Sequence, residues 1–180
     1  MKKTSIIALK IGLGILALLM TLGNNCITSG NIVVVIDNLS DLEGQTDTTF
    51  TPRYVDLTDN SDWQDHKDQL NSVDDIGFAC KITNHESTVA TGQIWISEKS
   101  YSSPADVRAS AVKILDGIAI AAGGTRSIEW KESADFLSHF NEAKTIIYKE
   151  KFHLYFMVAE TPFHIDVKDI ILFLSCNGKP

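Results

Sequence analysis

Alternating hydrophobic and polar residues form the clearest pattern in the chain, and they predict β-strands. In residues 75–83, the apolar side chains Ile, Phe, Cys and Ile share one phase, and Gly, Ala, Lys and Thr share the other. Residues 152–158 repeat this alternation with Phe, Leu, Phe and Val. Residues 170–176 are almost wholly apolar, as expected for a strand that is buried on both faces or packed in a sandwich. The pattern predicts two sheets whose apolar faces share one core.

Other segments predict additional short strands and connections. The β-branched run 32–36 predicts a buried strand, and residues 37–49 are polar enough to predict a loop. The following elements are expected in chain order: an extended edge segment at 50–57, a hairpin formed by 75–83 and 89–97, and a strand at 126–130. Residues 107–120 are ambiguous, because a Ser-Pro pair precedes them but β-branched residues favour strands at 112–114 and 118–120.

Two segments predict helices. Residues 61–70 begin with a capping Ser and early acidic residues, and residues 133–146 carry a helical stripe of Phe, Leu, Phe and Ala. Many short strands without a βαβ rhythm predict a mostly β protein, an antiparallel β-sandwich (immunoglobulin-like or similar) with one or two short helices. An α+β layer fold is the alternative.

The first residues of the chain have the three parts of a secretory signal peptide. Residues 1–10 are positively charged, residues 11–22 are an uncharged apolar run, and small polar residues follow. A run of 12 apolar residues is short for a membrane span, which needs about 20. We therefore predict a signal peptide at 1–25, an N-terminal strand and linker at 26–49, and a sandwich domain at 50–180.

Cys26 follows the apolar run in the sequence LGNNC, which resembles the signal of bacterial exported lipoproteins. The resemblance covers Leu22 to Cys26 alone and implies that Cys26 is lipidated and becomes the first residue. The pattern departs from the family, which has an aliphatic residue three places before the cysteine and a small residue directly before it. Ordinary cleavage after Gly23 or after Gly30 is the alternative.

The charge and the cysteines fit an exported protein. After the leader the chain carries 13 basic and 23 acidic residues, a formal net charge of −10, which disfavours nucleic acid as a partner. Lipidation of Cys26 would leave Cys80 and Cys176, which are a candidate disulfide pair; two buried free thiols are the alternative.

Few residues are arranged for catalysis or metal binding. The five histidines lack zinc-ligand spacing, although His164 and Asp166 share one strand face without an identifiable third ligand. Phosphate-binding and nucleophile-elbow motifs are absent from the sequence. The densest acidic stretch supplies candidate calcium ligands without an EF-hand's Gly and Glu, namely Asp56, Asp59, Asp62 and Asp65.

Trp63 lies in a polar helical segment and is the tryptophan expected to be exposed, which makes it a candidate binding residue for a protein or carbohydrate ligand. Trp95 and Trp130 lie in predicted strands and are expected in the core. Taken together, the sequence predicts an exported, lipid-anchored envelope protein with a non-catalytic binding or structural role and no cofactor. The membrane is its expected partner, through the N-terminal anchor, and an extracytoplasmic hydrolase-like enzyme is the alternative.

Overall fold

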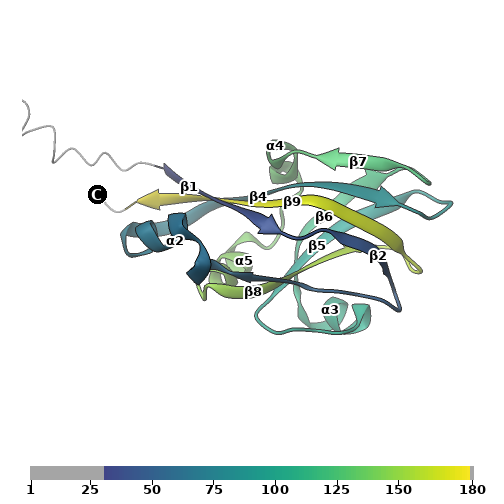
Figure 1. Cartoon of the computed structure of the whole chain (residues 1–180), viewed down its shortest axis with the longest axis horizontal. Helices are drawn as coiled ribbons and strands as arrows, with labels where there is room; N and C mark the ends of the chain where they lie inside the picture. The colour runs from purple at the N-terminus through teal and green to yellow at the C-terminus, as the bar shows by residue number, and fades with distance from the viewer. Residues whose placement is uncertain (1–30, 179–180) are drawn as a thin grey trace, which may run out of the picture.

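The computed structural model describes residues 31–178, which form two antiparallel sheets packed face to face (Figure 1). The strands are β1 (Asn31–Leu39), β2 (Leu42–Thr46), β3 (Arg53–Asp56), β4 (Leu70–Asn84), β5 (Ala90–Ser97), β6 (Val112–Ile120), β7 (Thr125–Ile128), β8 (Lys151–Val158) and β9 (His164–Gly178). The α-helices are α2 (Ser61–His66), α3 (Pro104–Ser110), α4 (Trp130–Ser133) and α5 (Phe140–Ile147), and 3-10 turns occupy Leu57–Asp59, Lys67–Gln69 and Ala134–Phe136. The predicted mostly β sandwich is confirmed, with more short helices than expected.

The strand order identifies the type of sandwich. One sheet has the order β1-β9-β4-β7, with β2 also paired to β9, and the other has the order β3-β8-β5-β6. Apart from the β1–β2 and β5–β6 pairs, strands that follow one another in the chain lie in opposite sheets. This repeated crossing between sheets is the arrangement of a jelly roll rather than of an immunoglobulin sandwich.

The two clearest alternating segments meet in one core, as predicted. Phe78 on β4 and Phe156 on β8 are each 1% exposed and belong to a single hydrophobic cluster that spans both sheets. In β9 the alternate residues Leu172, Leu174 and Cys176 are buried in the same cluster. The apolar phases of these strands therefore line the space between the sheets.

The predicted hairpin of 75–83 with 89–97 is wrong, because β4 and β5 lie in opposite sheets. The connection between them is held by Asn84, whose side chain is completely buried. Its amide donates hydrogen bonds to the carbonyls of Thr88 (2.8 Å) and Ala121 (3.2 Å), and its oxygen accepts one from the Glu86 N–H. The backbone ladders of the two strands are formed elsewhere, by β4 with β9 and β7 and by β5 with β8 and β6.

The sandwich begins earlier than the predicted boundary at residue 50. β1 pairs with β9 along most of its length, and β2 pairs with β9 further along. Residues 37–49 were expected to be a loop because they are mostly polar, yet they contain β2, and Leu42 and Gln45 of this strand are buried. Both strands therefore belong to the folded domain, and β2, which lies in the predicted linker, is part of a sheet.

The helix predicted at 133–146 is interrupted. Leu137 pairs with Leu115 of β6 in an isolated β-bridge, and the Ser138 N–H donates to the carbonyl of Ile114. His139 then adopts a left-handed conformation (φ 53°) just before α5 begins. These backbone contacts with the sheet replace one helical turn.

Within residues 31–178, no helix is long and apolar enough to cross a membrane.

Candidate functional site

Trp63 is buried, which corrects its prediction as an exposed binding residue. It is 2% exposed, and its indole Nε1–H donates a 3.0 Å hydrogen bond to the carboxylate of Glu150. The turn preceding α2 places it inward, because Asn60 caps that helix by accepting a hydrogen bond from the Trp63 N–H. Trp63 therefore points from α2 into the core and offers no stacking surface to a ligand.

The aspartate stretch has local structural roles. Asp56 caps the 3-10 turn that follows β3 by accepting from the Thr58 N–H, and it forms an ion pair with Lys151 at 3.0 Å. Hydrogen bonds from the Thr58 hydroxyl and from Lys151 lower the Asp56 pKa to about 2. The exposed residues Asp59, Asp62 and Asp65 follow it along the turn and α2. In the described part of the chain, no three His, Cys, Asp or Glu side chains are placed to hold a metal ion.

Cys80 and Cys176 are free, buried thiols, so the candidate disulfide is wrong. Cys176 lies opposite Val73 in the β4–β9 ladder, whereas Cys80 lies seven residues further along β4. At about 3.3 Å per residue this separation is roughly 20 Å, far beyond the reach of a disulfide. Burial raises the Cys80 pKa to about 12 and the Cys176 pKa to about 11.

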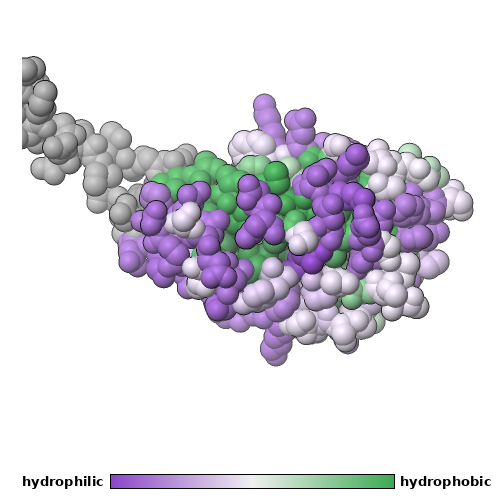
Figure 2. Space-filling model, in the orientation of Figure 1, coloured by the Kyte–Doolittle hydropathy of each residue, from purple (hydrophilic) through white to green (hydrophobic). Residues whose placement is uncertain are grey.

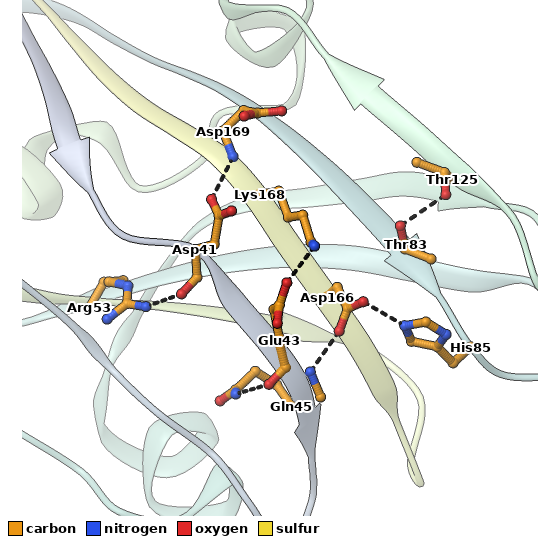
Figure 3. Close-up of polar contacts among 11 residues, drawn as sticks. Asp41, Glu43, Gln45, Arg53, Thr83, His85, Thr125, Asp166, Lys168 and Asp169 are labelled. Atoms are coloured by element: carbon orange, nitrogen blue, oxygen red, sulfur yellow. Dashed lines mark hydrogen bonds and ion pairs between the residues drawn. The ribbon is translucent and has the colours of Figure 1, made fainter.

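A polar cluster lies at the end of the sandwich where β4 ends and β9 begins (Figure 3). His85 Nε2 and Asp166 Oδ2 are 2.9 Å apart, and the His85 and His164 rings lie 4.5 Å apart, centre to centre. The Gly44 N–H of β2 donates to Asp166 Oδ1 at 2.6 Å. His85, in the connection between β4 and β5, therefore lies beside both His164 and Asp166, but in the described residues these three side chains are not placed to hold a metal ion.

The hydrogen bonds of Asp166 favour its charged form and lower its pKa. Partial burial acts to raise its pKa, but the bonds from Gly44 and His85, with the nearby Lys168, outweigh burial and lower it. Lys168 itself pairs with Glu43 of β2, so the charges are matched across the two strands. The His85 ring thus contacts a carboxylate on one side and the His164 ring on the other. The contacts tie β2, β9 and the crossing connection together.

Trp130 is the most exposed of the three tryptophans, although the sequence predicted it in a core strand. It begins α4, is 48% exposed, and lies against Phe173 of β9 with the ring centres 5.9 Å apart. A side chain at Gly77 would meet Trp130 and Ser133 at 3.3 Å, so the missing side chain allows α4 to approach the sheet. Trp130 also borders a small hollow of about 50 Å³ that reaches Val33. This surface is the clearest apolar feature on the outside of the sandwich.

Other hollows open on the surface of the described residues. One, of about 200 Å³, lies between β1 and β3 and is bordered by Asp56 and Asp59. Asp56 accepts a hydrogen bond from the Thr58 N–H and forms an ion pair with Lys151 there. Asp56 and Asp59 are therefore not a free acid–base pair.

No protein-family model matches the chain, and no curated protein sequence matches it. Among solved structures, the chain is similar to one of Desmodium yellow mottle tymovirus, with 10% identity and a TM-score of 0.31, over 84% of this chain and 91% of that chain. Two structures of turnip yellow mosaic virus have TM-scores of 0.30 and 0.26 at 10% and 11% identity. They cover 84% and 83% of this chain, and 94% and 82% of theirs. A likeness this low carries no argument about function.

Proposed function

We propose that the chain is an exported envelope protein, anchored to a membrane by a lipid on Cys26, whose jelly roll has a non-catalytic binding or structural role. The observation that carries the proposal is the short interval between Cys26 and the fold. β1 begins at Asn31, so five residue steps, about 18 Å at full extension, connect the proposed anchor to the sandwich. A lipid on Cys26 would therefore hold the whole domain at the membrane surface.

The two ends of the sandwich support a division between anchoring and binding. β1 begins and β9 ends at the same end of the molecule, where Asn31 pairs with Asn177 (Figure 1). The connections β4–β5, β6–β7 and β8–β9 lie at the opposite end, with Val89 61% exposed there. Loops carried on a rigid sheet are where binding residues are most often found. A ligand would meet these loops on the side of the domain away from the anchor.

Cell fractionation of Cys26→Ser tests this function. The variant should move from the membrane fraction to the soluble extracytoplasmic fraction, because two acyl chains are enough for stable anchoring and their loss removes the attachment. Thr28→Ala is the matched control, since it alters the same segment and keeps Cys26. A Cys26→Ser protein that remained with the membrane as fully as the control would contradict the proposal.

A further inference from the structure

Apolar side chains gather on the outer face of the sheet formed by β1, β9 and β4, where a solvated sheet would carry polar ones. Val33 is 54% exposed, and Val35, Ile171 and Phe173 are half-buried on the same face. Val35 lies opposite Phe173, which lies opposite Gly77, so the apolar row crosses three strands. Figure 2 shows hydrophobic surface over this part of the molecule. We call Val33, Val35, Ile171, Phe173 and Trp130 the outer apolar face.

The aromatic part of this face is held in place. α4 is attached to β4 by the buried hydroxyl of Ser133, which accepts a 2.8 Å hydrogen bond from the Phe78 N–H and donates to the Trp130 carbonyl. Gly77 allows α4 to approach, and Phe173 supports one side of the Trp130 ring. An aromatic ring fixed in this way presents a large apolar surface at little entropic cost.

The strand edge beside this face is partly closed. The Asn60 side-chain amide donates a 3.0 Å hydrogen bond to the Val35 carbonyl, which would otherwise point away from the sheet. α2 contacts β1 at this edge. A partner that extended the sheet by adding a strand would have to displace this bond. The face therefore favours an occupant that contacts side chains rather than the backbone.

The position of the face relative to Cys26 indicates which occupant that is. Val33 lies on β1 only seven residue steps after Cys26, about 25 Å at full extension. We propose that the outer apolar face rests on the bilayer to which Cys26 is anchored, so that the domain lies on the membrane with this sheet towards the lipid. The inference rests on the proposed function, because a lipidated Cys26 is what brings the face to the membrane.

The chemistry of the face selects the type of lipid surface. Tryptophan is enriched at membrane interfaces, where its ring is buried and its N–H reaches polar groups. Asp75 borders the hollow beside Trp130, Asp37 lies further along β1, and the chain after the leader has a net charge of −10. Anionic headgroups would be repelled by this charge. We therefore expect contact with neutral phospholipid such as phosphatidylcholine.

Tryptophan quenching tests the contact. The full-length protein, purified with its native N-terminus, is reconstituted into phosphatidylcholine vesicles whose acyl chains carry bromine near the headgroup. The bromines should quench the fluorescence of Trp130. In Trp130→Phe, the decrease in tryptophan fluorescence caused by the bromines should be less than half of the decrease in the parent protein. Trp95→Phe is the matched control, because Trp95 lies on the other sheet beside Lys113 and should leave the quenching in place. Unchanged melting temperatures would show that both variants are folded.

The outcomes separate this inference from the proposed function. A lipidated protein whose quenching is the same in Trp130→Phe as in the parent protein would overturn the membrane contact and leave the anchor intact. Cross-linking between copies through Val33→Cys, with Trp130 unquenched, would likewise overturn it and show that a second copy covers the face. An unmodified Cys26 in the purified protein would overturn the anchor and the membrane contact together.

Discussion

The hydroxyl of Ser133 and the backbone N–H of Phe78 are joined by a buried 2.8 Å hydrogen bond that connects α4 to the sheet. Ser133 is completely buried, although the sequence predicted it at the start of an amphipathic helix. The bond satisfies a β4 backbone donor next to Gly77, where α4 replaces a neighbouring strand. A serine in a short helix thereby determines where Trp130 is held.

Ser133→Ala should therefore lower the free energy of unfolding. The substitution leaves the Phe78 N–H buried without an acceptor, which costs about 1–3 kcal/mol. Urea unfolding followed by fluorescence measures the change. Ser127→Ala, at an exposed position on β7, is the control and should have little effect. Equal stabilities of the two variants would show that the hydrogen bond does not hold α4.

The thiols of Cys80 and Cys176 should be unreactive in the folded protein. Burial raises the pKa of Cys80 to about 12 and that of Cys176 to about 11, so almost no thiolate exists at pH 8. Iodoacetamide should label both residues in denaturant without prior reduction and neither in the native protein. Peptide mass spectrometry gives the result for each residue. If the denatured protein had to be reduced before Cys80 and Cys176 could be labelled, the two thiols would be joined in a disulfide. That result would contradict their separation in the β4–β9 ladder.

The carboxylate of Asp166 should stabilise the folded protein near neutral pH, and this stabilisation should be lost in acid. Its folded pKa is lowered below the usual 3.8, because the bonds from Gly44 and His85 outweigh the opposing effect of burial. A lowered carboxyl pKa contributes stability that is complete above the unfolded pKa and is lost as pH falls through the folded pKa. In urea titrations between pH 6 and pH 3, Asp166→Asn should therefore show a smaller loss of unfolding free energy than the parent.

The comparison needs a control because other carboxylates also titrate over this range. Ser127→Ala, at an exposed position on β7, keeps every carboxylate and should follow the pH dependence of the parent protein. If Asp166→Asn and Ser127→Ala gave the same pH dependence, the hydrogen bonds of Asp166 would contribute nothing to stability.

The sequence predicted those elements whose own pattern determines their burial. The alternation around Phe78 and Phe156 placed both residues correctly in one core, because a period of two has one buried phase in any sandwich. The same pattern could not show which strands share a sheet. β4 and β5 resemble a hairpin in sequence, and the buried amide of Asn84, which holds the crossing, carries no short-range signal.

The candidate site residues were less predictable because their positions depend on contacts distant in sequence. Trp63 was expected to be exposed and is buried, because it is hydrogen-bonded to Asn60 and Glu150. Trp130 was expected in the core and is exposed, because α4 packs on the outside of the sheet at Gly77. These partners lie up to 87 residues away in the chain. Burial of a single aromatic residue therefore could not be inferred from its immediate neighbours.

Intact-mass spectrometry of the protein purified from membranes tests the central claim, that Cys26 carries the anchor. We expect a chain that begins at Cys26 and carries a diacylglyceryl group, with residues 1–25 removed. Such a mass would place the jelly roll, which starts at β1 with Asn31, about 18 Å or less from the lipid. An unmodified chain beginning at Asn24 or Asn31 would contradict the claim and show that the protein is simply secreted.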